Sequence, residues 1–489
     1  MPRSNLLLLL LLLWGTRLLA LEILPLHNDE GLHLTRAVEV WNGHPFWAIS
    51  DGKIINHWLI AAFYPQNAPV FAGRIATLFV SMIGLAAGCA LAKRLSGAAG
   101  ALLAGGLWIM SPYLFFYERL AFSDAEAGAL VVAAVWLALR ASRSRRRRDA
   151  MLTGLALGAA MLMKFTAAPF AFTAALALLV DKTHPPSHRI RLLALVVLAV
   201  AACFAVPLAY LLLKGGDLFA IAFGWLGVSS GQGMAFFANI ERLWAQLAGF
   251  GAFAWSALML FGLALLGMSR RAPGRWLVAA WGLPLLIMLL VGREVLSRHY
   301  VAALPLALTL AGVGLGAGVR RFRGEQARYL AASAALAALM LGFIPFVLTA
   351  YTDPAALPLP EDVRYQHITS HSAGYGLREA VQAFPSTLAG SDLAIIGSMF
   401  PDSCRRANFY AASAPKLTCA DAPGLPEISA ALDQRVRVYT LVDSAPLIGV
   451  DVNTVNARAT LIAVYPRPGE NENTASVRLW LLEQQPSQP

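Results

Sequence analysis

The chain has 489 residues, of which 58% are hydrophobic and only 14% are charged. Soluble globular domains carry about 25% charged residues, so this composition excludes an ordinary soluble enzyme and any disordered or fibrous protein. Several apolar runs of about 20 residues exclude a single-span anchor as well, and they indicate a polytopic membrane protein with a smaller part outside the membrane.

The first apolar run covers residues 5–26 and follows Arg3. A signal peptide cleaved near Ala20 is one interpretation. The run is longer than the usual signal-peptide core of about 7–15 residues, and the next segment is also directed to the membrane, so we favour an uncleaved first span. Under either interpretation, the chain from residue 27 onward begins on the outer face.

Further apolar runs bring the prediction to about eleven transmembrane helices of about 20 residues each, although two of the runs are short for a span. These runs are residues 68–92, 97–114, 124–141, 150–163, 165–180, 191–213, 243–268, 276–292, 299–319 and 329–351, and the short ones are 150–163 and 165–180.

The basic residues support one orientation of these spans. With the N-terminus in the cytoplasm, every dense basic cluster falls in a predicted cytoplasmic loop, as the positive-inside rule requires. The clusters are Lys93-Arg94, Arg143 with Arg145 to Arg148, Lys182 with Arg189 and Arg191, Arg270-Arg271 with Arg275, and Arg320, Arg321, Arg323 and Arg328. The net charge of +11 is therefore a topology signal, and no nucleic-acid partner is expected.

Three stretches are predicted to lie outside the membrane on the outer face, residues 27–67, 115–123 and 352–489. The last follows the transmembrane domain of residues 1–351, and its strand-type runs and one helical pattern predict an extracytoplasmic α/β domain. The runs are residues 393–396, 436–442, 459–464 and 477–482, and the helical pattern covers 375–384. Cys404 and Cys419 both lie there, where a disulfide is permitted, and a bridge between them is left open.

The first outer loop, residues 27–67, is long for a mere connection. Its first part has a helical pattern that places Asp29, His33 and Arg36 on one face and apolar residues on the other. This pattern predicts an amphipathic helix in the membrane interface, with a wet polar face. Such a face is either a solvated surface or part of a site.

Two features of this loop favour a site. Asp29 and Glu30 stand at the exit from the first span, at the edge of low dielectric, where a carboxylate can act as a base. The loop also holds four of the nine His residues, which are His27, His33, His44 and His57. Together with carboxylates these could bind a divalent metal, but no tight ligand spacing is present, so the cofactor is unknown and no metal ligand is assigned.

Further charged residues stand at predicted outer edges. Asp51-Gly52 favours a turn that presents Lys53 near the membrane surface, and Arg74 follows near the outer end of the second span. Such residues either snorkel to the interface or hold a lipid-linked phosphate. In the second outer loop Pro112 ends or kinks the third span, and Asp124 opens the next one, where it either caps a helix or serves a site.

These residues resemble the GT-C superfamily of membrane glycosyltransferases, in particular its protein O-mannosyltransferase and lipid A aminoarabinose transferase branch. The resemblance covers roughly residues 1–320 and rests on the order of the motifs and on their placement on one membrane face. The motifs are Asp29-Glu30, Asp51-Gly52-Lys53, Arg74, Ser111-Pro112 with Glu118-Arg119 through Asp124, Gly154 to Lys164, and Arg298-His299-Tyr300 with Pro305.

The resemblance implies a sugar donor linked to a polyprenyl phosphate, used on the extracytoplasmic face with inversion at the anomeric carbon. Asp29 matches the family's catalytic aspartate, Glu30 its neighbouring acid, and Asp124 the acid of the second outer loop. Lys53 matches a basic residue near the lipid phosphate, and Arg298 one on a later outer edge. The predicted substrate- and phosphate-binding set is completed by Arg74, Arg119 and His33.

The expected partners are a polyprenyl-phosphate-linked sugar, an acceptor protein, lipid or glycan, and membrane lipid. The sugar and the acceptor are left open, because Gly31-Leu32-His33 and Lys53-Ile54-Ile55-Asn56 depart from the pattern of relatives. The expected location is the plasma (inner) membrane, with the N-terminus in the cytoplasm and the C-terminal domain outside.

Two other classes of function are weighed against a transferase. A transporter or flippase of lipid-linked sugars would place its ionisable residues near the bilayer midplane, often in repeated halves, whereas the candidate acids here stand at outer edges and no internal repeat is evident. A receptor or assembly subunit that uses the tail for binding is the third interpretation.

Overall fold

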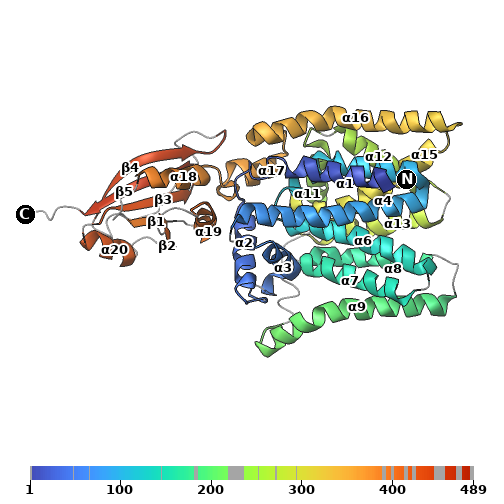
Figure 1. Cartoon of the computed structure of the whole chain (residues 1–489), viewed down its shortest axis with the longest axis horizontal. Coiled ribbons are helices and arrows are strands. Elements are labelled where there is room, and N and C mark those ends of the chain that lie inside the picture. Colours follow the sequence, from blue (N-terminus) through green and yellow to red (C-terminus); the bar gives the residue numbers. More distant parts are fainter. Residues whose placement is uncertain are drawn as a thin grey trace, which may run out of the picture. The chain divides into compact units, whose positions relative to one another are not determined.

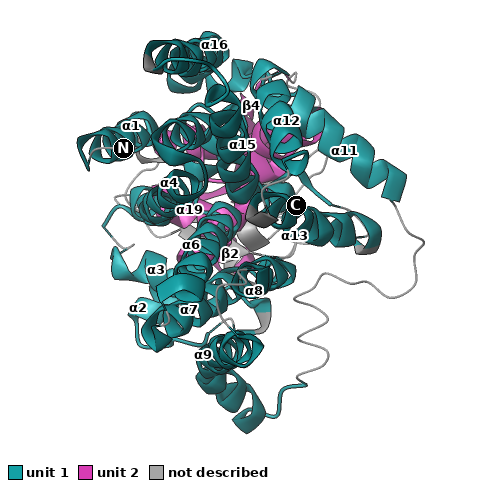
Figure 2. Cartoon of the chain, turned by 90° about the vertical axis from the view of Figure 1, so that its right-hand side faces the viewer, with its two compact units in different colours: residues 1–21, 36–360 teal, residues 22–35, 361–489 magenta. Residues whose placement is uncertain are grey.

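The computed structural model describes residues 3–47, 49–64, 67–144, 146–180, 185–217, 236–251, 253–269, 272–292, 295–387, 393–397, 401–411, 417–420, 426–434, 436–444, 457–469 and 476–484. The chain divides into two compact units, which have different colours in Figure 2. Unit 1 is formed by residues 1–21 and 36–360, and unit 2 by residues 22–35 and 361–489.

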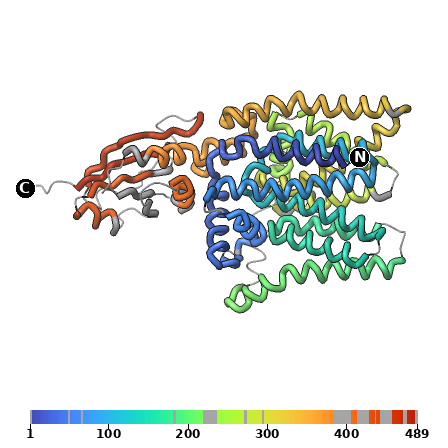
Figure 3. Tube along the Cα trace, in the orientation of Figure 1, coloured from blue at the N-terminus to red at the C-terminus, as the bar shows by residue number. Residues whose placement is uncertain are grey.

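Unit 1 is a bundle of helices, most of which run along one common direction, with α9 and α16 at opposite edges (Figures 1 and 3). Its helices are α1 (Arg3–Leu18), α3 (Ile54–Ala62), α4 (Pro69–Ile109), α5 (Pro112–Glu118), α6 (Ser123–Ser144), α7 (Arg147–Met163), α8 (Ala171–Val180), α9 (Pro186–Leu213), α11 (Phe236–Ala248), α12 (Phe253–Gly267), α13 (Ala272–Val291), α14 (Ser297–Val301), α15 (Leu304–Val319) and α16 (Glu325–Thr352). Short 3-10 helices are η1 (Ile49–Asp51), η2 (Phe165–Phe170) and η3 (Pro354–Ala356), and α2 (Asn28–Trp41) begins in unit 2 and ends in unit 1.

Among the described residues, 4 helices are long and apolar enough to cross a membrane, or up to 5 if the bent pair α11 and α12 is counted as one span. The 4 helices are Pro69–Ile109, Ser123–Ser144, Pro186–Leu213 and Gln326–Thr352, and shorter apolar helices cover Phe165–Val180, Gly274–Leu290 and Leu304–Val319. Each apolar run of the sequence contains a helix. The predicted number of about eleven spans is nevertheless not confirmed by length and composition.

Helix α4 covers the predicted run 68–92 and most of the run 97–114, whose last residues belong to α5. Gly97 has a φ of +78°, which interrupts the right-handed helix at that point. The Cys89 thiol, before Gly97, donates to the carbonyl oxygen of Ala101, after it, at 3.6 Å. This contact shows that the chain folds back beyond Gly97. The two predicted runs therefore correspond to two helical arms that meet at Gly97.

The predicted span at residues 243–268 is wrong as a single straight helix. Helices α11 and α12 are bent by 115° at the break between them. Phe250 and Gly251 have φ values of +57° and +62° there, outside the right-handed helical region. A Cβ at Gly249 would lie 2.5 Å from the Cγ of Pro360, so only glycine lets the chain pass this proline.

Small residues let the central helices of unit 1 approach closely. A Cβ at Gly312 of α15 would lie 2.4 Å from the Cα of Ala104 in α4. A Cβ at Gly84 of α4 would lie 2.7 Å from the Cα of Ala129 in α6. In a lipid environment helices associate by packing of this kind, because small side chains bring the backbones into van der Waals contact. Gly312 and Gly84 therefore let α15 and α6 pack closely against α4.

The connecting segments of unit 1 gather at two ends. Asn5 and Gly97, at the predicted cytoplasmic ends of two spans, and Arg328, in a predicted cytoplasmic loop, line one pocket. Arg74 and Arg119, both predicted to face outward, bind backbone carbonyls that follow the opposite end of α1. Segments that the sequence assigns to the same membrane face thus lie at the same end of unit 1. Which end faces the cytoplasm stays a prediction.

The sheet of unit 2 has its strands in the order β2-β1-β3-β5-β4, and β1 is parallel to β2 and β3 while β5 is antiparallel to β3 and β4. The strands are β1 (Leu393–Gly397), β2 (Leu417–Ala420), β3 (Val438–Ser444), β4 (Ala457–Pro466) and β5 (Ser476–Gln484). The helices of unit 2 are α17 (Glu361–Arg364), α18 (Leu377–Thr387), α19 (Pro401–Tyr410) and α20 (Pro426–Asp433), with short turns η4 (Tyr365–Thr369) and η5 (His371–Ala373).

Alternate residues of the strands cover the two faces of this sheet. Tyr439 and Leu441 of β3 pack in the apolar cluster that includes α18 and α19, whereas Val438 packs with α20. Helix α18 and four of the strands coincide with predicted segments, while β2, α19 and α20 were not predicted. The side chains of Cys404 and Cys419 lie outside the described residues, so a bridge between them stays a prediction.

Candidate active site

A reciprocal pair of hydrogen bonds closes the start of α2. The Oε2 atom of Glu30 accepts from the backbone N–H of His27 at 3.0 Å, and the Nδ1 atom of His27 accepts from the backbone N–H of Asp29 at 3.1 Å. This is a capping box in which an imidazole replaces the usual Ser or Thr hydroxyl. Glu30 is fully buried and serves the helix end, whereas Asp29 is partly exposed.

The segment that leads into α2 is held by the C-terminal part of unit 2. Arg406 of α19 donates to the carbonyl oxygens of Leu26 at 3.4 Å, Ser372 at 3.1 Å and His371 at 2.8 Å. The Tyr410 hydroxyl accepts from the backbone N–H of Leu26. Arg406 is fully buried, so its guanidinium is a fixed link between α19 and the chain before Asp29.

Two glycines permit this close approach. A Cβ at Gly31 would lie 2.6 Å from the Cγ of Arg406, and a Cβ at Gly374, whose φ is +81°, would lie 2.5 Å from the carbonyl oxygen of Leu26. Larger residues at either position would push the two segments apart. Asp29 is therefore placed between two anchored points of the backbone, Leu26 before it and Gly31 after it.

The polar face predicted for α2 is not a solvated face at His33. His33 and Leu34 are both buried, although the helical pattern places them on different faces. The prediction of a wet polar face over Asp29, His33 and Arg36 is therefore wrong at its middle residue, because α2 packs on more than one side. A sequence pattern reports the apolar face of a helix but not what covers the polar one.

In unit 1, Arg36 connects α2 to the loop that carries Lys53. Arg36 forms an ion pair with Asp51, two residues before Lys53. His57 lies buried on α3, and burial lowers the pKa of His57 well below its usual value, with the charges of Arg36 and Lys53 lowering it further. His57 is therefore neutral at pH 7 and adds no third positive charge to this group.

We expect His57 to make the folded chain sensitive to acid. The pKa of His57 lies below the value of about 6.5 that an exposed His has in an unfolded chain. The unfolded state therefore binds more protons in acid, so this contribution to stability is present above about pH 6.5 and falls by up to about 1.4 kcal/mol per pH unit below it. Thermal unfolding in detergent over a series of pH values measures this slope.

The variant His57→Gln should flatten the loss of stability in acid. His44→Gln is the matched control, because the His44 side chain belongs to the same loop and is 62% exposed, and this variant should keep the wild-type slope. The same slope in the wild type and in His57→Gln would mean that His57 is not held neutral by burial.

Arg74 and Arg119, predicted as phosphate ligands, bind the backbone that follows α1. Arg74 Nη1 donates to the carbonyl oxygen of Leu21 at 2.8 Å, and Arg119 Nη2 donates to that of Leu19 at 3.0 Å. Both side chains are buried. Cations that bind the carbonyls beyond a helix C-terminus stabilise that end, so both arginines have a structural task there.

Charge is concentrated around these two arginines. Burial lowers the pKa of Arg119 to about 10, Tyr351 opposes this shift, and the positive charges of Arg74 and Arg17 add to it. Arg119 remains protonated at pH 7. Arg17 therefore belongs to the same buried group, which brings three guanidinium groups to the end of α1.

Glu118 is a counter-ion of this group. Arg17 Nε donates to Glu118 Oε2 at 2.9 Å, and Trp108 Nε1 donates to Glu118 Oε1 at 2.8 Å. Burial raises the pKa of Glu118, and the charge of Arg17 and the hydrogen bond from Trp108 oppose this. Arg17 also donates to the carbonyl oxygen of Ile109 at 2.8 Å, so the pair joins α1, α4 and α5.

Asp124 and Lys164 form an ion pair at 2.5 Å that joins the first turn of α6 to the end of α7. Asp124 is 2% exposed, so its carboxylate is a buried partner of Lys164 rather than a simple helix cap. The Arg298 guanidinium lies over the ring of Phe122, 5.9 Å from the ring centroid. Phe122 precedes Asp124 by two residues. Unit 1 therefore brings one acid and two cations to the start of α6.

The structure adds two buried ionisable residues that the sequence analysis did not single out. Arg17 pairs with Glu118, and Glu126 is fully buried in α6, two residues after Asp124. A charge inside an apolar run is expensive in lipid and is a functional candidate for that reason. The signal was therefore present in the predicted spans at 5–26 and 124–141.

Among the described residues, no group of three or more His, Cys, Asp and Glu side chains could hold a metal ion. The histidines of the first outer loop have different neighbours. The ring of His27 lies 4.6 Å from that of His367, His44 pairs with Glu39, and His57 is buried on α3.

The predicted site residues are divided between the two units. Unit 2 holds Asp29, Glu30 and His33, and unit 1 holds Lys53, Arg74, Arg119, Asp124 and Arg298. Within unit 1 the structure brings Arg74 to Arg119, brings Arg298 to the start of α6 with Asp124, and places Lys53 beside Arg36 and His57.

The chain is similar in fold to solved membrane glycosyltransferases, so the resemblance found in the sequence is confirmed at the level of the fold. Residues 52–210 match the model of the family described as dolichyl-phosphate-mannose-protein mannosyltransferase. No curated protein sequence matches the chain.

Solved structures of this fold are similar over most of the chain. ArnT from Cupriavidus metallidurans, bound to undecaprenyl phosphate, has a TM-score of 0.64 at 12% identity, with 98% of each chain covered. The mycobacterial arabinofuranosyltransferase AftD has a TM-score of 0.54 at 15% identity, with 100% of this chain and 42% of AftD covered. The oligosaccharyltransferase AglB from Archaeoglobus fulgidus, in complex with an inhibitory peptide and a dolichol-phosphate, has a TM-score of 0.50 at 12% identity, with 90% and 69% covered.

Proposed function

We propose that the chain is a glycosyltransferase that moves a sugar from a polyprenyl-phosphate donor to an acceptor hydroxyl on the outer face of the plasma membrane. The GT-C fold and the match to the mannosyltransferase family over residues 52–210 support this proposal. The donor class is supported by the lipids in two similar structures, undecaprenyl phosphate in ArnT and a dolichol-phosphate in AglB. The N-terminus is assigned to the cytoplasm and the C-terminal tail to the outside.

In the proposed step the acceptor oxygen attacks the anomeric carbon of the sugar. The bond between this carbon and the phosphate oxygen breaks, and the polyprenyl phosphate leaves with the bonding electrons. Asp29 takes the proton of the acceptor hydroxyl as general base, a role worth about 10²–10⁴-fold in rate. A single displacement of this kind inverts the anomeric carbon.

The cations of unit 1 are assigned to the charge that develops on the leaving phosphate. Lys53 and Arg298 are the predicted ligands, and Lys164 joins them because Asp124 holds it near the start of α6. Asp124 acts in this scheme by positioning Lys164. Arg74 and Arg119 support the chain between α1 and α2, and His33, one turn after Asp29, stays a predicted substrate contact.

The proposal rests on the different environments of Asp29 and Glu30, the two neighbouring acids at the start of α2. Glu30 is buried and caps the helix, whereas Asp29 is partly exposed in the first turn, where the helix dipole favours an ionised carboxylate. The tail of a polyprenyl phosphate stays in lipid, so its sugar–phosphate bond lies at headgroup depth. An ionised acid on a fixed helix end is suited to act as a base there.

Vesicles that contain the purified chain and labelled polyprenyl-phosphate sugars separate this function from lipid transport. The proposal predicts acceptor glycosylation and release of free polyprenyl phosphate. Movement of intact donor between leaflets, with no release from any donor tested, would instead identify a flippase.

We expect Arg406→Lys to lower the transfer rate by about ten- to hundredfold at an unchanged KM for the donor. Lys keeps the charge but loses the fork that links the carbonyls of Leu26, Ser372 and His371, so the backbone before Asp29 is less precisely placed. Arg405→Lys, on the preceding residue of α19, is the matched control and should keep the wild-type rate. Initial rates over a range of donor concentrations give both constants, and equal rates in the two variants would contradict the positioning role.

A further inference from the structure

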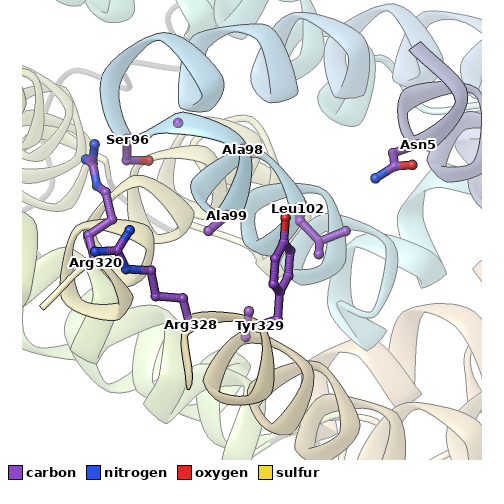
Figure 4. A pocket seen from close by; sticks show the side chains of 10 residues that line it. Asn5, Ser96, Ala98, Ala99, Leu102, Arg320, Arg328 and Tyr329 are labelled. Atoms are coloured by element: carbon purple, nitrogen blue, oxygen red, sulfur yellow. The ribbon is translucent and has the colours of Figure 1, made fainter. Parts of the chain in front are cut away.

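A pocket of about 300 Å³ lies at the end of unit 1 that carries the N-terminus (Figure 4). Its wall is formed by the start of α1, the turn of α4 at Gly97, the end of α15 and the first turns of α16. Arg17, at the other end of α1, belongs to the buried arginine group near the candidate active site. The pocket is therefore separate from that site, and no predicted site residue lines it.

Two arginines supply the charge of this pocket. Figure 4 shows the side chains of Arg320 and Arg328 on the side of the pocket where Ser96 lies. Arg320 Nη2 donates to the carbonyl oxygen of Leu95 at 3.4 Å, and Arg328 Nε donates to that of Phe322 at 3.2 Å. Among the described residues that line the pocket, none is acidic.

Apart from Asn5 and Ser96, the rest of the wall is mostly apolar. Ala98, Ala99, Leu102 and Ala332 line it, with the ring of Tyr329. Deeper along the second arm of α4, a Cβ at Gly105 would lie 2.7 Å from a methyl group of Leu9 of α1. At Gly106 it would lie 2.1 Å from a methyl group of Leu336 of α16. Helices α1 and α16 thus both pack on this arm.

The surfaces on both sides of the pocket are suited to lipid. Leu7 and Leu8 of α1 are 58% and 57% exposed, and Leu330 and Leu341 of α16 are 73% and 79% exposed. Such exposure of large apolar side chains on two helices is expected where acyl chains cover them. A molecule that enters the pocket between these helices would therefore have its charged part at the arginines and its apolar part on exposed leucines.

We propose that this pocket binds the phosphate headgroup of an anionic phospholipid. Guanidinium groups bind phosphate oxygens through paired N–H donors, and basic pockets between transmembrane helices on the cytoplasmic side bind anionic headgroups. The pocket belongs to the face that the positive-inside rule assigns to the cytoplasm. The bound lipid links α1, α4, α15 and α16, so it stabilises the folded bundle.

Lipid titration of the purified chain in neutral detergent tests the proposal through thermal unfolding, since a ligand that binds only the folded state raises its stability. Phosphatidylglycerol should raise the unfolding temperature of the wild type. The double variant Arg320→Gln/Arg328→Gln should require at least about tenfold more lipid for the same rise, because two charged hydrogen-bonding partners are lost. The variant Arg321→Gln/Arg323→Gln, which removes equal charge from the same loop outside the pocket, should behave as the wild type.

Three outcomes would overturn the proposal. The first is an unchanged lipid response in the pocket variant, and the second is an equal response of the wild type to phosphatidylcholine. The third is an equal response to glycerol phosphate, which would assign the pocket to a soluble phosphate. If the double variant does not fold, Arg328→Gln alone serves in its place, because Arg328 is exposed and its loss leaves the packing intact.

Discussion

Asp29→Asn is expected to lower the rate of sugar transfer by about 10²–10⁴-fold while the chain stays folded. Asn has nearly the shape of Asp but cannot take the proton of the acceptor hydroxyl. The hydrogen bond from residue 29 to the His27 ring is made by the backbone N–H of residue 29, which the substitution keeps. Single-turnover transfer from a labelled donor gives the rate, and thermal unfolding reports the fold.

Glu30→Gln is the matched control for this variant. The Gln amide oxygen can still accept from the N–H of His27, and capping boxes accept Gln at this position. We expect transfer close to the wild-type rate, whereas Glu30→Ala should lose about 1 kcal/mol of stability with the cap. If Glu30→Gln lost as much activity as Asp29→Asn, the division of roles between the two acids would be refuted.

The largest effect on stability is expected for Glu118→Gln. This change leaves the buried guanidinium of Arg17 without its counter-ion, beside Arg74 and Arg119. Removing one partner of a buried ion pair costs about 3–5 kcal/mol, because the other charge remains in a medium of low dielectric. The unfolding temperature of the variant in detergent should therefore be lower than that of the wild type by on the order of 10 °C.

A double variant distinguishes an uncompensated charge from lost packing. Arg17→Met/Glu118→Gln removes the stranded charge and keeps an acceptor for the indole of Trp108. It should recover more than half of the loss seen in Glu118→Gln, since apolar replacements of buried pairs are often tolerated. A double variant less stable than Glu118→Gln would show that Arg17 stabilises the bundle mainly through its other contacts.

The sequence predicted the location of the helices well, because apolar runs in a membrane protein have few alternatives to a helix. It also marked the fold-back of α4, whose two arms were predicted as separate runs. It did not predict the break between α11 and α12. That break depends on Gly249 meeting Pro360, a contact between residues more than a hundred positions apart.

The candidate site was predicted in part for a similar reason. The sequence identified the two acids at the start of α2, but it did not predict that one is buried and the other partly exposed. His27 takes the place of a Ser or Thr in the capping box, so the usual signature was missing. The hold of Arg406 on Leu26 spans 380 positions and leaves no local pattern. Arg17 was overlooked because its partner Glu118 is 101 positions away.

The most direct measurement follows both products of the reaction in one experiment. Purified chain is incubated with a series of polyprenyl-phosphate sugars and acceptor extract, and released polyprenyl phosphate is counted against glycosylated acceptor. For at least one donor, one polyprenyl phosphate should appear for each sugar transferred, with the anomeric configuration inverted and with both products lost in Asp29→Asn. Transfer that persists undiminished in Asp29→Asn, or a product of retained configuration, would contradict the proposed displacement.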